Sequence, residues 1–540
     1  MTYSVKNVTR NAAMVETPLA PKEPIAVIEV GSSAIRMVIA ELGPKLAIRT
    51  LENLQKPIAF GKDVFNNGRL SHASIRESIE ILDNFESVLE SYGVKRVQAI
   101  ATSAVREAAN RDNFLDQVFV RTGIDVEVVE GAEENRLDLI AVENALQGRF
   151  DFDKKNCLIM EVGTGSTEII LTNKGEVSLT RTLLIGPLRL PDQSVAGKTD
   201  PAALQRTLKR RIHAVAEEFG RECDLSEINT FIAMGATMRF VCRQLYERMD
   251  ETLATLTPKE FADSLKTLSK MSMEELSEKY SLPYADAEAL YASLLIYANF
   301  LSETKAENIL VPMVSIRDGL LLELAQLVSG YKRTDLSRQV IHSARNLAKR
   351  YKYDEPHAAA VTQISLKLFD LLQESHGLGS RERLLLEISA ILHDIGSFIS
   401  PSNHHKHGFY LIQAAEIFGL RKIDKDVVAN VVRYHRRSAP KNTHIPYISL
   451  PRPERAVVSK LAAILRVAEA LDASHQQKCR DFTLEQNGDS CILWVPEEAG
   501  DLSLERQSLA KKSDMLTDVL GYLIVLKQGR PAAQPAGRQA

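Results

Sequence analysis

The sequence predicts two α/β domains built on one repeated plan, followed by a mainly α-helical domain. Each of the first two domains opens with apolar, strand-like segments, and a turn rich in Gly, Ser or Thr separates the first two segments. After Tyr331 the strand patterns almost disappear and long amphipathic helical patterns follow. Together these observations indicate an internal duplication with a helical addition.

The first domain is expected over residues 24–150. Three strand patterns, IAVIEV, RMVIAEL and LAIRTLENL, precede a long amphipathic helix over about 74–92. VQAIAT, a helix near 110–121, VEVVE and a helix over about 132–146 complete an alternation of buried strands and helices. This alternation predicts a sheet with strands packed against helices.

The second domain is expected over residues 151–330 because the same order restarts there. CLIMEV, a GTGST turn, EIILTN and EVSLTRTLLIG again give three strands before helical sequence begins near Asp200. A helical domain is expected over 331–480 and a small mixed segment, which contains CILWV, over 481–526. Both ends of the chain are predicted to be loose tails, over 1–23 and 527–540.

Composition narrows the class of protein. The chain has 540 residues, 45% hydrophobic and 25% charged, which is typical of a folded globular protein of roughly three or four domains. A net charge of −3 provides no general basic field, so we expect neither nucleic acid nor a membrane as a partner. Five scattered cysteines without a CxxC pair indicate a reducing compartment. The longest apolar run, YASLLIYANFL, is too short to span a bilayer. We therefore predict a cytoplasmic location.

Two turns are candidate phosphate-binding loops, because small residues let backbone N–H groups and hydroxyls approach phosphate oxygens. An ordinary hairpin would use the same residue types, but two such turns at equivalent places in a repeat favour the phosphate site. The candidate phosphate-binding residues are Gly31, Ser32, Ser33, Gly163, Thr164, Gly165, Ser166 and Thr167.

An acidic residue lies two positions before each turn, inside an otherwise apolar strand. These residues are Glu29 and Glu161. Burying an unpaired carboxylate is costly, and a bound metal ion would explain both acids.

Histidines gather in the C-terminal third, where ten of the twelve lie between His342 and His475. The spacing from His357 to His393 and Asp394 places these residues on separate helices, as a metal site within a helical bundle requires. Each histidine alone could be an ordinary core or surface residue, but the group favours a metal or phosphate site.

Several motifs of the first two domains resemble the exopolyphosphatase and guanosine pentaphosphate phosphohydrolase family. They are AVIEVGSSAIRMVIA, IATSAVREAANRDNFL, TGIDVEVVEGAEENRL, LIMEVGTGSTEIIL, LIGPLRL and MGATMRF, over roughly residues 25–325. The most specific element is ATSAVREA combined with GAEENRL. The resemblance implies an actin-like ATPase (ASKHA, ribonuclease H-like) fold for both α/β domains.

The resemblance also implies roles for individual residues. Glu134 would be the general base that deprotonates the attacking water, with Glu168 as a second active-site carboxylate and Arg106 as a partner of a phosphate oxygen. Glu161 and Glu29 would hold Mg²⁺. From residue types alone, Glu134 could equally lie in a solvated first helical turn.

This chain departs from the family pattern at several of these positions. The family usually has Asp at positions 29 and 161, and the longer Glu changes the geometry offered to Mg²⁺. Ser33 and Ala34 replace Asn-Ser, and Thr164 replaces a Gly that could need positive φ. We expect a compensated active site, with a non-catalytic sensor of polyphosphate or an alarmone as the alternative.

The C-terminal third resembles the HD-type metal phosphohydrolase domain through ILHDIGSFIS, HHKHGFYLI, VVRYHRRSAPK and LAAILRVAEALDASH, over about residues 335–480. Glu469 stands where such domains usually close the site with Asp, and Asp472 is a candidate substitute. By this resemblance the metal ligands would be His357, His393, Asp394 and His435, with His404 or His405 nearby.

The sequence therefore predicts a cytoplasmic phosphohydrolase with Mg²⁺ in the α/β part and a candidate second divalent metal in the helical part. Inorganic polyphosphate, shortened from its end to release orthophosphate, is the favoured substrate, and guanosine pentaphosphate is the second. Separate hydrolytic activity at His393 and Asp394 is a further alternative. A homodimer is implied only by the family resemblance.

Overall fold

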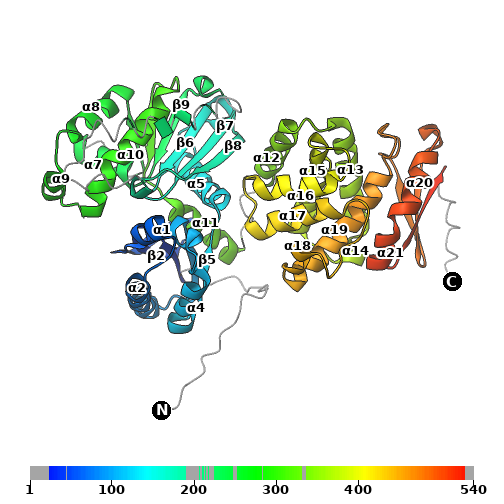
Figure 1. Ribbon diagram of the computed structural model, residues 1–540, viewed down its shortest axis with the longest axis horizontal. Coiled ribbons are helices and arrows are strands. Elements are labelled where there is room, and N and C mark those ends of the chain that lie inside the picture. The colour runs from blue at the N-terminus through cyan, green and yellow to red at the C-terminus, as the bar shows by residue number, and fades with distance from the viewer. Residues whose placement is uncertain are drawn as a thin grey trace, which may run out of the picture. The chain divides into compact units, whose positions relative to one another are not determined.

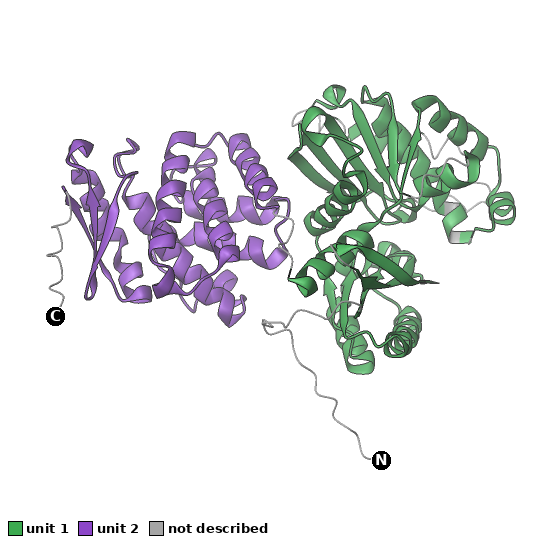
Figure 2. Ribbon diagram, turned by 180° about the vertical axis from the view of Figure 1, so that it is seen from behind, with its two compact units in different colours: residues 1–335 green, residues 336–540 purple. Residues whose placement is uncertain are grey.

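The computed structural model divides the chain into two compact units, residues 1–335 and 336–540 (Figure 2). The described residues are 23–43, 46–189, 224–246, 252–282, 284–330 and 336–529, with isolated positions between 206 and 217. The helical start predicted near Asp200 and nearly all of both predicted tails lie outside the described residues.

The first sheet of unit 1 has the strand order β3-β2-β1-β4-β5. Its strands are β1 Pro24–Val30, β2 Ala34–Leu42, β3 Ile48–Pro57, β4 Arg96–Ala101 and β5 Val126–Val128. β1 pairs antiparallel with β2 and parallel with β4. The central strand β1 is a nearly continuous apolar run because helices cover both faces of the sheet.

The second sheet of unit 1 repeats this arrangement, with the order β10-β11-β9-β6-β7-β8. Its strands are β6 Asn156–Val162, β7 Thr167–Asn173, β8 Glu176–Leu183, β9 Thr230–Met234, β10 Leu253–Leu256 and β11 Ile309–Pro312. β6 pairs antiparallel with β7 and parallel with β9, as β1 pairs with β2 and β4. The predicted duplication is thus confirmed, and β10 is an addition that pairs antiparallel with β11.

Two helices link the halves of unit 1, α5 Gly131–Leu146 and α11 Ile316–Ser329 (Figure 1). α5 contacts β7 and β8 of the second sheet as well as α11, and α11 packs on β1 of the first sheet. A Cβ at Gly319 would collide with the carbonyl of Leu137, and a Cβ at Gly131 would collide with the side chain of Thr182. The two glycines therefore permit the close packing that fixes the position of α5.

The remaining described helices of unit 1 lie around the two sheets. They are α1 Phe60–Asn67, α2 His72–Ser91, α3 Ser103–Glu107, α4 Arg111–Thr122, α7 Ala236–Leu245, α8 Pro258–Leu268, α9 Met273–Tyr280 and α10 Tyr284–Ser302. No described helix in either unit is long and apolar enough to cross a membrane.

Unit 2 is mainly helical, as predicted, and ends in a small three-stranded sheet. Its helices are α12 Ser337–Arg350, α13 Glu355–Leu371, α14 Gln373–His376, α15 Ser380–Leu392, α16 His404–Ala414, α17 Lys422–Tyr434, α18 Ile445–Ile448, α19 Arg452–Ala470, α20 Ser503–Lys512 and α21 Asp514–Leu520. Its strands are β12 Thr483–Asn487, β13 Ser490–Val495 and β14 Leu523–Gln528. Helices and sheet share one apolar core, and β14 includes Lys527 and Gln528, where the sequence predicted the start of a tail.

One acid on α5 generates a prediction about stability. Burial raises the pKa of Glu143 to about 7. The Glu143 carboxyl group holds its proton more tightly in the folded protein than in the unfolded chain, where its pKa is near 4.5. The resulting contribution to stability is fully present below pH 4.5 and is lost as the pH rises through 7. We expect Glu143→Gln to stabilise the protein at pH 8, by up to about 3 kcal/mol, and to have little effect at pH 4.5. Differential scanning calorimetry at the two pH values measures this, and equal effects at both would contradict it.

Candidate active site

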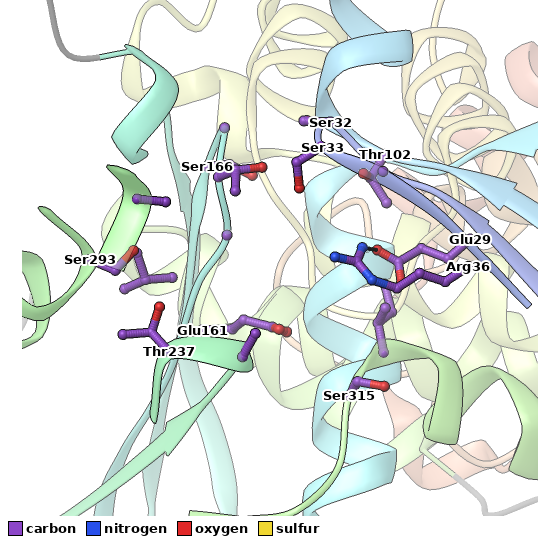
Figure 3. A pocket seen from close by; sticks show the side chains of 18 of the residues that line it. Glu29, Ser32, Ser33, Arg36, Thr102, Glu161, Ser166, Thr237, Ser293 and Ser315 are labelled. Atoms are coloured by element: carbon purple, nitrogen blue, oxygen red, sulfur yellow. Dashed lines mark hydrogen bonds and ion pairs between the residues drawn. The ribbon is translucent and has the colours of Figure 1, made fainter. Parts of the chain in front are cut away.

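A cavity of about 280 Å³ lies in unit 1 where the two repeated turns face each other (Figure 3). Its walls come from both sheets and from α5, α7, α10 and the start of α11. The predicted site residues that line it are Glu29, Gly31, Ser32, Ser33, Glu134, Glu161, Gly163, Thr164, Gly165, Ser166 and Glu168. Residues that lie more than 130 positions apart in the sequence therefore share one cavity.

The two turns have the same local geometry. The backbone N–H of Gly31 donates to the Ala34 carbonyl at 3.0 Å, and that of Gly163 donates to the Ser166 carbonyl at 2.9 Å. Thr164 does not have positive φ, so the Gly-to-Thr departure introduces no left-handed strain. A Cβ at Gly165, by contrast, would collide with Phe65 and with the hydroxyl of Ser103.

The register of the paired strands determines which charged side chains lie opposite each other beside the two turns. Glu29 lies opposite Arg36 across β1 and β2, whereas Glu161 lies opposite Glu168 across β6 and β7. The Nη1 of Arg36 is 3.2 Å from Oε1 of Glu29, and the Nε of Arg317 is 3.3 Å from Oε2 of Glu29. The first acid is thus neutralised by two guanidinium groups, and its counterpart faces another carboxylate.

The second half of the cavity therefore concentrates carboxylates whose charge Arg239 and Arg106 offset only in part. Burial is the largest cause that raises the pKa values of Glu161, Glu168 and Asp138, and for Asp138 the charges of Glu161 and Glu168 add to it. Asp138 also shares a hydrogen bond with Glu161. The negative charges of Glu161 and Glu168 and the hydrogen bond with Glu161 therefore oppose ionisation of Asp138 and raise its pKa further.

Carboxyl oxygens are ligands that a divalent cation takes, although these three carboxyl groups are not one of the groups of convergent ligand atoms found among the described residues. Among the described residues, the buried oxygens Oε1 of Glu168 and Oδ1 of Asp138 have no hydrogen-bond partner. Oxygen ligands of this kind suit Mg²⁺, and a cation would replace the protons that the raised pKa values retain. Glu29, predicted as a metal ligand, is the poorer candidate because two arginines already balance its charge.

Glu134 lies in the first turn of α5, one helical turn before Asp138 and on the same face. Arg106, on α3, forms an ion pair with Oε1 of Glu134 and donates to the Val129 carbonyl at 2.7 Å. Burial raises the pKa of Glu134, while Arg106 opposes that rise. Arg106 is not among the residues that line the cavity, but its charge acts on Glu168, which does.

Thr167 is the predicted phosphate-binding residue that the structure places elsewhere. Its side chain is buried and does not line the cavity, and its hydroxyl donates to the Ile185 carbonyl at 2.6 Å.

Sequence reasoning missed several charged residues of the cavity, which are Arg36, Asp138, Arg239, Asp286 and Arg317. Two features of the sequence could have identified some of these residues. Asp138 is an acid one turn after Glu134 on a helix that is buried on almost every side, and Arg36 falls opposite Glu29 once β1 and β2 are paired through their turn. Arg239 and Arg317 lie in the first turns of α7 and α11, which follow strands at the cavity.

The predicted metal residues of unit 2 come together at helix ends in that unit. His357, His393, Asp394 and His435 form one cluster with His404, whereas His405 belongs to neither group of convergent ligands found among the described residues. Glu469 pairs with Lys512, and Asp472 lies 2.8 Å from Nδ1 of His357. Neither residue belongs to the groups of convergent ligands found among the described residues, and the closing ligand stays a prediction.

Comparison with known proteins gives consistent matches over both units. Residues 38–327 match the Ppx/GppA phosphatase family, and residues 340–514 match Ppx/GppA phosphatase domain III. A guanosine-5'-triphosphate,3'-diphosphate pyrophosphatase of Photobacterium profundum is 24% identical over 466 residues, which cover 84% of this chain and 86% of the relative. A protein of the same name from Aeromonas hydrophila is 24% identical over 490 residues, covering 87% and 92%.

Among solved structures, an exopolyphosphatase from Cytophaga hutchinsonii aligns with 57% of this chain and 99% of its own, at 21% identity and a TM-score of 0.51. This likeness and the repeated strand order confirm the predicted actin-like fold of the α/β part. The resemblance of unit 2 to an HD-type domain stays a prediction.

Asp138 provides a test of the cation site. Without a divalent cation, we expect Asp138→Asn to raise the unfolding temperature by a few degrees, because it removes one of the mutually repelling carboxyl groups. Mg²⁺ should then stabilise the wild-type protein and stabilise the variant much less, since stabilisation follows affinity for the folded state. Thermal unfolding with and without Mg²⁺ measures both effects. Glu143→Gln, on the same helix and outside the cavity, is the control for the Mg²⁺ effect alone, and equal Mg²⁺ stabilisation of Asp138→Asn and wild type would contradict the assignment.

Proposed function

This chain belongs to the Ppx/GppA phosphatase family, and we propose that it hydrolyses the terminal phosphoanhydride bond of inorganic polyphosphate to release orthophosphate. The observation that carries this proposal is the single cavity in which two small-residue turns, several arginines and Glu134 meet. A polyphosphate end is a compact polyanion, and such turns and guanidinium groups are the partners that bind phosphate oxygens.

Glu134 is proposed as the general base. Its Oε1 pairs with Arg106, which leaves Oε2 to accept a proton from water. The water oxygen then attacks the terminal phosphorus, the bond from phosphorus to the bridging oxygen breaks, and the electron pair leaves on the shortened chain. Burial raises the pKa of Glu134, which makes the carboxylate a stronger base.

The turns and arginines would position the substrate. Ser33 and Ser166 lie near each other at the two turns that line the cavity (Figure 3), and the Ser166 side chain also shares a hydrogen bond with Glu168. Arg36 and Arg317 provide positive charge beside the first turn, where Glu29 also fixes their orientation. Holding the terminal phosphoryl group in line with the attacking water is the main task of such a site.

Mg²⁺ is proposed as the cofactor of this cavity. Glu161, Glu168 and Asp138 would hold it, for the reasons of charge and missing hydrogen bonds given above. When bound, the ion would neutralise charge on the phosphoryl oxygens. The negative charges of these three carboxyl groups would then be balanced by the bound ion.

Guanosine pentaphosphate is the second candidate substrate, and one feature of the cavity favours it. Phe240, Leu282 and Leu290 form an apolar part of the lining beside the polar turns. An aromatic ring and aliphatic side chains can contact the flat face of a nucleobase. The two relatives described above carry the name of an enzyme for this nucleotide.

The base assignment is tested by orthophosphate release from long-chain polyphosphate with Mg²⁺. We expect Glu134→Gln to lower the rate at least about 100-fold, because the amide cannot accept the proton of water. Glu143→Gln should retain the wild-type rate. Release that persists in Glu134→Gln would contradict the assignment, and ligand binding without release by wild type would indicate a sensor.

The choice of substrate is tested by Phe240→Ala. If guanosine pentaphosphate is the substrate, its KM should rise about tenfold, since base stacking on an aromatic ring contributes roughly 1–3 kcal/mol. The KM for polyphosphate, which has no base, should stay close to the wild-type value in the same preparation. Equal effects on both substrates would contradict a nucleobase contact at Phe240.

A further inference from the structure

We propose that Glu29 is an internal competitor of the substrate, because its carboxylate pairs with the guanidinium groups of Arg36 and Arg317 that a phosphate group would contact. The inference rests on the proposed function of the cavity in unit 1 and concerns how tightly that cavity holds a polyphosphate end. It gives Glu29 a role that differs from the metal ligand expected from the sequence.

The contact follows from the places of the three residues in the fold. Glu29 is the penultimate residue of β1, directly before the first turn, and lies opposite Arg36 on β2. Arg317 lies in the first turn of α11, which packs on β1. The two arginines therefore reach the carboxylate from different elements, and Figure 3 shows the side chains of Glu29 and Arg36 in contact at the cavity.

The carboxylate of Glu29 lies against the first phosphate-binding turn. A Cβ at Gly31 would be 3.2 Å from Oε1 of Glu29 and 3.3 Å from Nη1 of Arg36. The same carboxylate oxygen accepts a hydrogen bond from Nη1 of Arg36 at 3.2 Å. A phosphate group that approached this turn would therefore meet the carboxylate beside the guanidinium group. Carboxylate and phosphate bind the guanidinium fork in the same way and repel each other, so they compete for it.

The pairing of Glu29 with Arg317 leaves a hydrogen bond unused. Oε2 of Glu29 is 3.3 Å from Nε of Arg317, yet this buried Nε has no hydrogen-bond partner among the described residues. A buried donor without an acceptor is costly. A phosphate oxygen could accept this hydrogen bond, so replacing the carboxylate with phosphate would improve the bonding of Arg317.

Arg36 has a second partner that does not depend on Glu29. Its Nε donates to Oε1 of Gln55 at 3.2 Å, and Gln55 lies on β3 and lines the cavity. We therefore expect the guanidinium group of Arg36 to keep its place when the carboxylate is removed.

The charges around Arg239 indicate what removal of the carboxylate would do. Burial lowers the pKa of Arg239, and the charge of Glu161 opposes this effect. The positive charges of Arg317 and Arg36 lower the same pKa further. The three guanidinium groups therefore repel each other even with Glu29 present. Without its charge they would repel more strongly, and they would bind an anion from solution more tightly.

The proposal is tested by calorimetric titration of the full-length protein with tripolyphosphate, in EDTA so that no divalent metal supports hydrolysis. We expect Glu29→Gln, which keeps the side-chain length and removes the charge, to lower the dissociation constant at least about tenfold. Glu29→Asp keeps the charge but shortens the side chain by one methylene, and it should also bind more tightly than wild type, by a smaller factor. Glu41→Gln is the control, because Glu41 pairs with Arg49 in the same sheet and does not line the cavity.

Thermal unfolding provides a second readout. Without an anion, Glu29→Gln should unfold at a lower temperature than wild type, because two largely buried arginines lose their acidic partner. Tripolyphosphate should then stabilise the variant more than wild type, since stabilisation follows affinity for the folded state. A substitution that merely damaged the fold would lower the unfolding temperature without this larger gain.

Two results would overturn the proposal. Glu29→Gln that binds tripolyphosphate no more tightly than wild type would show that the carboxylate does not compete with phosphate. Wild-type affinity in Glu29→Asp would show that the contacts of the carboxylate are not the cause. These outcomes are separate from those of the hydrolysis assay. Tighter binding by Glu29→Gln without orthophosphate release would support the competitor and contradict the proposed function, and release without a gain in affinity would do the reverse.

Discussion

Carboxylates withdrawn from water require positive charge beside them, and the structure around the cavity of unit 1 depends on how that charge is supplied. At the first turn it is supplied within the chain, by Arg36 and Arg317 around Glu29. At the second turn, Glu161 faces Glu168, and the neighbouring Asp138 adds a third carboxyl group. Burial raises the pKa values of all three, and neighbouring carboxylates add to the rise at each of them. The duplicated scaffold thus keeps one geometry while its two halves differ in charge.

Because of this difference in charge, the two halves of the cavity are suited to different ligands. The half that is neutralised by arginine is suited to phosphate oxygens, and the half with excess carboxylate is suited to a cation. Glu134 lies on α5, which packs between the two sheets, so the same helix positions the proposed base and one proposed metal ligand. Glu29, one of the two Glu residues that depart from the family pattern, has two arginine partners within 3.3 Å.

Much of this arrangement could be predicted from the sequence, and the exceptions have physical reasons. The strand and turn patterns identified both sheets, and the helix expected over 74–92 is α2, which begins after the N-cap Ser71. The pairing of Glu29 with Arg36 requires the strand register, and the contribution of Asp138 requires the rotation of α5. Neither can be obtained from local patterns. Thr167 has the right residue type, but its hydroxyl is used by the Ile185 carbonyl.

In unit 2, spacing alone identified separate helices that carry His357, His393 and Asp394, whereas the choice between His404 and His405 depended on which side of α16 faces Asp394.

The central claim is that cations provide the positive charge that the chain itself lacks. The most direct measurement is anomalous diffraction from crystals of the Mn²⁺-loaded protein. The account predicts one peak among Asp138, Glu161 and Glu168 and none at Glu29. A peak at Glu29, or the absence of a peak among Asp138, Glu161 and Glu168, would contradict it.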